Sequence, residues 1–356
     1  MFLLYSYISA VLFFSSYSYG ANILAALPTP SYSHQIAYTH IWRELSLRGH
    51  NVTLITTDPL KDPKLTNLTE IDMRWMYSLI ADISTAAEDR LLSTWKIHNW
   101  IHDFLKNISE AHLSHSTISD LIRNRHNSFD VVLTEFLYAE FLAFAVIYEC
   151  PKILFSSLDT FVSFHNAMGN NIHPALYPDM GLPFSVPRNF RERVESTLFA
   201  LHSMLSHSRK IFPMKDQLIK NFFGLTVTTQ SLIHEADMLF LNVNPVIQNI
   251  RAIGPTTINI GDLRRTLPIK PLPEDLKKFL DGAKDGFIYF SLGSNVKSKE
   301  LRKESLNSIM QALGEMPYKV LWKFEDDYLP GKPQNVKLVK WAPQQAVLGT
   351  CLQKSS

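Results

Sequence analysis

Short apolar runs alternate with longer amphipathic segments along the chain, and this alternation predicts a parallel α/β sheet. The first repeat places a strand at 22–27, a helix from about 34 to 48 and a second strand at 51–57. Gly49 follows the helix, where a glycine commonly closes the last turn. Because a right-handed crossover joins the two strands, we expect them to run parallel. Further strands are expected in this half of the chain: 129–134, 152–156 and 238–243.

The segments between these strands differ in character. Helices are expected at 86–124 in two segments, at 138–148, and at 191–237 in two stretches. Trp95, Trp100 and Phe104 recur at helical spacing, which indicates either core packing or the lining of a ligand pocket. Prolines and glycines mark 157–188 as a long irregular loop, and loops of that length are usually functional.

The second half repeats the alternation after a proline-marked segment at 253–273, which we interpret as a linker between domains. Strands are predicted at 287–291, 319–324 and 336–341. In parallel sheets, ligands bind beyond the carboxyl ends of the strands. Four residues lie at or just past those ends, and we expect them to share one crevice: Gly293, Ser294, Trp341 and Gln344.

The length of 356 residues suffices for two domains. We expect a first domain at 21–252 and a second at 274–356. The second has only about 80 residues, fewer than the roughly 150 that such a domain should need. The predicted fold class is therefore α/β, with an incomplete second sheet.

Composition narrows the class of protein further. A hydrophobic content of 46% and a charged content of 19% are those of a globular protein. The net charge of +2, with no basic stripe, gives no case for nucleic-acid binding. The two cysteines, Cys150 and Cys351, cannot build a disulfide framework or a cysteine zinc site. We find no motif for a metal or a bound cofactor.

The N-terminal twenty residues predict a secretory signal peptide, cut before Ala21, although they lack the usual basic start. A retained anchor is the alternative. Acceptor sequons at Asn67 and Asn107 fit a glycosylated protein of the endoplasmic reticulum lumen. Beyond this start, the sequence holds no stretch of eighteen consecutive apolar residues, so we expect no further membrane span and no C-terminal anchor.

Two short motifs in the second half carry a family resemblance. The strand FIYF runs into SLGS at Ser291–Ser294, and WAPQ follows at Trp341–Gln344. In this order and spacing they resemble the donor-binding half of an animal UDP-glycosyltransferase, similar to the UDP-glucuronosyltransferases. The resemblance extends from Asn22 to Gly349. It implies a GT-B fold of two Rossmann-like domains, with a lipophilic acceptor bound by the first and a UDP-sugar by the second.

The resemblance also implies roles for residues of the first domain. Ser33–His34 matches the family's Ser–His pair, which makes His34 the catalytic base; histidine suits that role because it titrates near the working pH. We further expect the helix N-terminus to keep the ring neutral. The family has an aspartate that orients this histidine. By its spacing from the strand 129–134, Glu140 takes that place, and Glu135 is the alternative.

On the donor side, the family stacks the tryptophan of WAPQ on the uracil, which assigns Trp341 to the base. Gln344 and the Gly293–Ser294 turn are then expected to make polar contacts around the nucleotide. No cofactor is implied, because the UDP-sugar is a co-substrate. Family members continue into a His/Gly-rich loop that holds the diphosphate, whereas this sequence ends at Ser356. We therefore expect transfer of glucose or glucuronic acid, with inversion, by a chain of impaired activity.

Two alternatives from other classes stay open. The chain could be a non-catalytic lumenal protein that binds acceptors or regulates full-length relatives by associating with them. It could instead use the first domain alone to bind a lipid or odorant. Copurification of a full-length relative would support the first alternative, and saturable binding of an apolar ligand without UDP would support the second.

Overall fold

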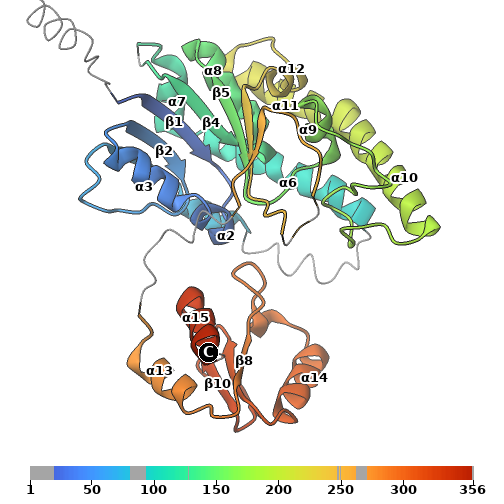
Figure 1. Cartoon of the computed structure of the whole chain (residues 1–356). Helices are drawn as coiled ribbons and strands as arrows, with labels where there is room; N and C mark the ends of the chain where they lie inside the picture. Colours follow the sequence, from blue (N-terminus) through green and yellow to red (C-terminus); the bar gives the residue numbers. More distant parts are fainter. Residues whose placement is uncertain are drawn as a thin grey trace, which may run out of the picture. The chain divides into compact units, whose positions relative to one another are not determined.

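The computed structural model describes residues 20–80, 94–126, 128–246, 248, 250–261 and 271–354. The predicted signal peptide, apart from Gly20, lies outside these residues, as do the start of the predicted helix 86–124 and residues 262–270 of the predicted linker. The chain forms two compact units, shown in Figure 1. The first holds most of the residues up to 263, and the second holds 264–356 with the short segments 31–33 and 77–91.

The first unit contains a parallel sheet of seven strands in the order β3-β2-β1-β4-β5-β6-β7. The strands are β1 (Asn22–Leu27), β2 (Asn51–Thr56), β3 (Leu68–Asp72), β4 (Val131–Glu135), β5 (Lys152–Ser156), β6 (Met238–Leu241) and β7 (Thr257–Asn259). The α-helices that surround this sheet are α2 (Tyr32–Ile36), α3 (Thr39–Leu47), α6 (Thr94–Leu113), α7 (Ser116–Arg123), α8 (Ala143–Tyr148), α9 (Val162–Ala167), α10 (Phe190–Ser206), α11 (Phe212–Leu218) and α12 (Thr229–His234).

Shorter helical pieces complete the chain's first two thirds. Two are 3₁₀ turns, η1 (Arg74–Met76) and η2 (Phe136–Leu142), and two are π-helical turns that flank α11, η3 (His207–Ile211) and η4 (Ile219–Phe223). The single turn α4 (Tyr77–Ile80) follows η1.

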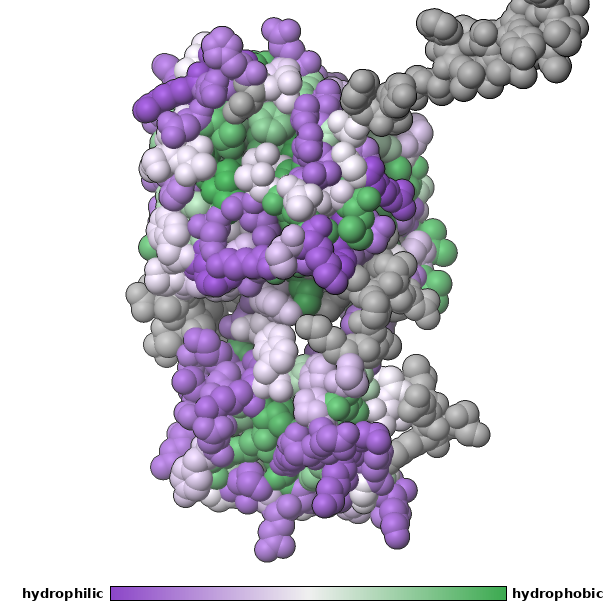
Figure 2. Space-filling model, turned by 90° about the vertical axis from the view of Figure 1, so that its left-hand side faces the viewer, coloured by the Kyte–Doolittle hydropathy of each residue, from purple (hydrophilic) through white to green (hydrophobic). Residues whose placement is uncertain are grey.

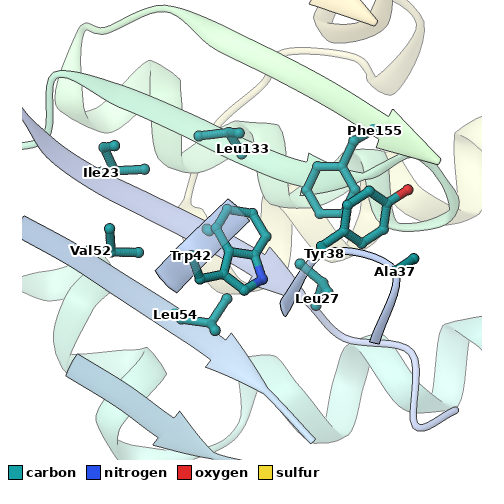
Figure 3. Close-up of a cluster of buried hydrophobic side chains, with 10 residues drawn as sticks. Ile23, Leu27, Ala37, Tyr38, Trp42, Val52, Leu54, Leu133 and Phe155 are labelled. Carbon is teal, nitrogen blue, oxygen red and sulfur yellow. The ribbon is translucent and has the colours of Figure 1, made fainter. Parts of the chain in front are cut away.

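Both faces of the large sheet are covered, as a parallel sheet requires. On one face, alternate residues of β1 and β2 pack under α3, and the rings of Tyr38, Trp42 and Phe155 meet there (Figure 3). The ring centroids of Tyr38 and Phe155 are 4.6 Å apart. Leu24 and Leu154, which point to the other face, are also fully buried. Strands buried on both sides are why these runs read as continuously apolar.

The second unit repeats this layering around a smaller sheet, ordered β10-β9-β8 and parallel throughout. Its elements are α13 (Glu274–Asp281), β8 (Phe287–Phe290), η6 (Ser298–Glu300), α14 (Lys303–Gly314), β9 (Lys319–Lys323), β10 (Val336–Val339) and α15 (Gln344–Lys354). Val320 and Trp322 of β9 pack against α14. Leu321 between them packs against α13 and α15. The predicted α/β class with two parallel sheets is confirmed.

Several boundaries differ from the sequence prediction. The helix expected at 34–48 is two helices, α2 and α3, which a turn at residues 37–38 separates. The expected closure by Gly49 is confirmed: its φ is +91° and its N–H donates to the Ser46 carbonyl at 3.0 Å. The strand β3 has few strongly apolar residues and was not predicted. The segment interpreted as linker contains β7, which pairs with β6 in the first sheet, so the linker prediction is wrong there.

Within the described segments, no helix has both the length and the apolar character needed to cross a membrane.

The surface of the first unit is mixed in character. Figure 2 shows one side of the chain, where hydrophilic residues in purple alternate with smaller green apolar areas on the first unit. That mixture is ordinary for a protein surface.

Candidate functional site

The first unit has a topological switch point between β1 and β4. These strands are neighbours in the sheet, but the chain continues from β1 towards β2 and from β4 towards β5. Connections that diverge in this way open a crevice at the carboxyl ends of the strands. His34 enters this place from α2, which follows β1, and Glu135 is the last residue of β4. The switch point therefore brings together two residues a hundred positions apart.

A hydrogen bond joins the side chains of His34 and Glu135, which become an ion pair when the imidazole is protonated. Nδ1 of His34 lies 2.5 Å from Oε1 of Glu135. The side chain of Glu135 is 1% exposed, whereas that of His34 is 21% exposed. Because a carboxylate only accepts hydrogen bonds, Nδ1 of the neutral ring carries the hydrogen and donates this hydrogen bond to Glu135. Nε2 is then the nitrogen with a lone pair available to accept a proton.

Neighbouring side chains fix this pair in place. The hydroxyl of Thr29 donates to the second oxygen of Glu135, and the hydroxyl of Ser157 lies 3.0 Å from Nδ1 of His34. The amide of buried Gln35 donates to the carbonyls of Leu27 and Thr29, at 2.9 and 2.8 Å. The loop between β1 and α2 is thus tied to the end of its own strand. The sequence did not predict this network, because isolated polar residues such as Thr29 and Ser157 form no recognisable motif.

The pKa of His34 is raised above its ordinary value of 6.5. Burial alone lowers the pKa, but the charge and the hydrogen bond of Glu135 outweigh it. The expectation that the helix N-terminus keeps the ring neutral is therefore wrong. The helix α2 has only five residues, and a carboxylate in direct contact is a stronger influence than so short a helix dipole.

Glu140 does not reach His34, so the expected pairing of these two residues is wrong. Glu140 is fully buried in η2. Its carboxylate accepts a hydrogen bond from Ser109 and pairs with Nζ of buried Lys215 at 2.5 Å. The same Nζ donates to the carbonyl of Leu137 at 2.7 Å. The strand β4 extends one residue beyond its predicted end, which makes Glu135 the acid at the sheet edge, and η2 turns Glu140 inward.

In the second unit, the carboxyl ends of β8, β9 and β10 also lie at one edge. Gly293 lies in the turn after β8 with φ of +86°, a conformation that favours glycine. Ser294 follows it and is half-buried. Trp341 follows β10, and 56% of its surface is exposed. Gln344 begins α15 and is exposed.

Lys323, the last residue of β9, connects these features and was not predicted. Its Nζ donates to the carbonyl of Gly293 at 2.8 Å and pairs with Glu325 at 2.7 Å. The same nitrogen lies 6.0 Å from the centroid of the Trp341 ring. Lys323 is 6% exposed. A lysine at the end of an apolar strand was the signal available in the sequence. The structure thus brings Gly293 and Trp341 together around one buried cation.

The remaining predicted positions can also be located. Asn67 is half-buried, directly before β3, and Asn107 is exposed on α6. The hydroxyl of Ser109, the third residue of the second sequon, is buried against Glu140. Use of these sequons stays a prediction. Among the described residues, no three His, Cys, Asp or Glu side chains are grouped to hold a metal ion.

The first unit also contains a pocket of about 470 Å³. Residues of the loop 157–188 and of the segment after β6 line it, among them Asp159, Leu182, Phe184 and Arg251. The guanidinium of Arg251 lies 5.2 Å from the centre of the Tyr177 ring. The long loop predicted from sequence therefore builds part of a cavity of ligand size, although it also contains the short helix α9.

Comparisons with known proteins agree with these features. The family model described as "UDP-glucoronosyl and UDP-glucosyl transferase" matches residues 23–355. The UDP-glucosyltransferase 2 of Dactylopius coccus is 29% identical over 94% of this chain and 65% of its own length. The ecdysteroid UDP-glucosyltransferase of Spodoptera littoralis nuclear polyhedrosis virus is 25% identical over 93% of this chain and 68% of its own. The chain thus spans about two thirds of the length of these relatives.

Solved structures of the same fold are also similar. The glycotransferase of kitacinnamycin superposes with a TM-score of 0.54 at 16% identity, over 93% of this chain and 74% of that one. The calicheamicin glycosyltransferase CalG4 gives 0.52 at 14% identity, over 93% and 73%. At these identities, the likeness shows the GT-B fold alone.

Proposed function

The chain belongs to the UDP-glycosyltransferase family, and on that premise we propose that it transfers a hexose from a UDP-sugar to a hydroxyl of a small lipophilic acceptor. The observation that carries this proposal is the contact between Nδ1 of His34 and Glu135 at 2.5 Å. A histidine held by a carboxylate through one nitrogen, with the other nitrogen available, is the arrangement of a general base.

The proposed reaction follows from this arrangement. Nε2 of His34 takes the proton of the acceptor hydroxyl while its oxygen attacks the anomeric carbon of the sugar. The bond from that carbon to the UDP oxygen breaks, and UDP leaves with the bonding electron pair. Attack opposite the leaving group inverts the anomeric centre. Glu135 stabilises the imidazolium that forms, and Thr29 and Ser157 hold the pair in position.

The second unit is proposed to bind the nucleotide at the edge formed by Gly293, Lys323 and Trp341. An exposed tryptophan ring after a strand end offers a flat apolar face on which a base can stack. Lys323 supports that ring and fixes the carbonyl of Gly293. We propose that Gln344 and Ser294 supply hydrogen-bonding groups near the base and the phosphates.

Two observations support a lipophilic acceptor. Apolar residues such as Leu182 and Phe184 line part of the pocket in the first unit, beside the charged residues Asp159, Asp179 and Arg251. One relative is named for ecdysteroids, which are hydroxylated steroids. The proposal includes both UDP-glucose and UDP-glucuronic acid as donors, although the names of two relatives favour glucose.

We also propose that the protein passes through the secretory pathway and carries glycans at Asn67 and Asn107. Expression in insect cells, followed by enzymatic removal of N-glycans, should give a mass shift that the Asn67→Gln/Asn107→Gln variant lacks. An unchanged mass in the parent protein would contradict glycosylation. It would leave the proposed transfer reaction unaffected.

A transfer assay tests the proposed function directly. The purified chain is incubated with UDP-glucose or UDP-glucuronic acid and a panel of phenols and hydroxylated steroids, and products are identified by mass spectrometry and anomeric NMR. We expect a β-linked product from one donor, formed about 10²- to 10⁴-fold more slowly by His34→Ala. The histidine His126, exposed in a loop, provides a matched control as His126→Ala. A folded chain that forms no product from either donor would overturn the proposal.

A further inference from the structure

The helix α10 presents an apolar stripe to solvent. Five of its large apolar residues are exposed: Phe190 at 83%, Val194 at 39%, Leu198 at 53%, Leu201 at 55% and Leu205 at 40%. Their spacing of four, four, three and four residues keeps them on one side of an α-helix. At 1.5 Å per residue, the stripe is about 22 Å long. Figure 1 shows α10 along an outer side of the first unit.

This stripe is not the face by which α10 packs on the protein. Ser196, Phe199, Ala200 and Ser203 are buried, and at 100° per residue they lie on the side opposite to the exposed stripe. Phe199 packs against Trp95 with ring centroids 5.1 Å apart. A surface helix that faces only water normally turns polar residues to solvent, whereas α10 exposes five large apolar residues in addition to the apolar residues that it buries.

Basic residues flank the stripe at both ends. From 188 to 210 the chain carries five basic residues, Arg188, Arg191, Arg193, Arg209 and Lys210, against two acids, Glu192 and Glu195. Glu192 is already engaged at the helix start, where it accepts hydrogen bonds from the Arg188 N–H at 2.6 Å and the Asn189 amide at 3.0 Å. Lys210 pairs with Asp103 at 3.0 Å, so the positive charge beside the stripe comes mainly from the arginines at its ends.

We propose that α10 is a membrane-surface helix, which inserts its stripe among the headgroups of an anionic lipid layer. A narrow apolar stripe with arginine and lysine beside it is the pattern of helices that lie in the interface plane. Five side chains of one helix also fall well short of the roughly 20 to 30 residues a side that a stable protein interface uses. The charge and the small apolar area together favour lipid over a second copy.

Vesicle flotation with the full chain tests this proposal. We expect the chain to float with vesicles of phosphatidylcholine and phosphatidylserine and to float less with phosphatidylcholine alone. The Leu198→Gln/Leu201→Gln variant should partition at least about ten-fold more weakly, because two large apolar side chains no longer enter the lipid. Leu47 on α3 is 56% exposed, so Leu47→Gln is a matched control and should float like the parent. Arg191→Gln/Arg193→Gln should reduce the preference for phosphatidylserine.

Circular dichroism and thermal unfolding of each variant confirm that α10 and the first unit are intact, which is expected because the altered side chains are exposed. Failure of the parent chain to float with either lipid would overturn the proposal. Equal flotation of the double Leu variant and the parent would overturn it as well. A self-associated parent in sedimentation velocity that the double variant renders monomeric, without lipid binding, would assign the stripe to a second copy instead.

Discussion

Candidate site residues lie at the carboxyl ends of the strands in both sheets, but the two sets of residues are held in different ways. In the first unit, His34 and Glu135 lie in a network of buried or half-buried hydrogen bonds that joins α2 and the end of β4 to the loops after β1 and β5. In the second unit, Trp341 is more than half exposed, and one buried lysine holds the turn beside it. The difference suits the proposed roles, because a base must be oriented before the reaction, whereas a stacking face must stay open for its ligand.

The largest expected effect comes from removing the base. His34→Ala should lower kcat/KM for transfer about 10²- to 10⁴-fold, which is the usual contribution of general base catalysis. Binding of UDP should not change, since His34 belongs to the first unit. Steady-state kinetics and calorimetry with UDP measure the two quantities. A variant that retains nearly full kcat/KM would contradict the role of His34 as the general base.

The buried pair of Glu140 and Lys215 should matter for stability. In Lys215→Met, the carboxylate of Glu140 loses its cation, and the free energy of unfolding should fall by about 3–5 kcal/mol. Lys210 pairs with Asp103 on the surface, so Lys210→Met should cost no more than about 1 kcal/mol. Chemical denaturation measures both. Equal losses in the two variants would contradict a structural role for Glu140.

These residues also show how far the sequence could be interpreted. Most strand positions, though not those of β3 and β7, and the motifs at 291–294 and 341–344 were predictable, because local patterns encode them. The partner of His34 was not, because a shift of one residue in the end of β4 decides which glutamate lies at the sheet edge. Lys323 was missed for a related reason. Its importance depends on neighbours brought together by pairing of β8, β9 and β10, which periodicity does not specify.

The pH dependence of transfer should test whether Glu135 pairs with His34. Transfer needs neutral His34, whose pKa is raised above 6.5, so kcat/KM should rise with pH through that higher pKa. In Glu135→Gln the rise should move to lower pH, because the opposing charge is gone. The ion pair also stabilises the fold fully below about pH 6.5, and this stabilisation is lost as pH rises through the folded pKa. A pH–rate profile unchanged by Glu135→Gln would contradict the pair.

The second edge should respond more mildly. Trp341→Ala should weaken UDP binding about ten-fold, in line with a base–aromatic stack worth 1–3 kcal/mol. Lys323→Met should weaken it by less, since the lysine acts through the Gly293 turn and the Trp341 ring. Lys323→Arg, which keeps the charge, should restore part of the loss. Calorimetry with UDP measures affinity, and tryptophan fluorescence monitors the ring. Unchanged affinity in Trp341→Ala would show that the uracil does not stack there.

The most direct test of the central claim, that Glu135 and not Glu140 holds His34, is an NMR titration of the His34 ring. It is to be recorded for the parent chain, Glu135→Gln and Glu140→Gln. We predict a pKa above 6.5 for His34 in the parent, a clear fall in Glu135→Gln and no change in Glu140→Gln. A pKa that falls with Glu140→Gln and stays constant with Glu135→Gln would contradict the account.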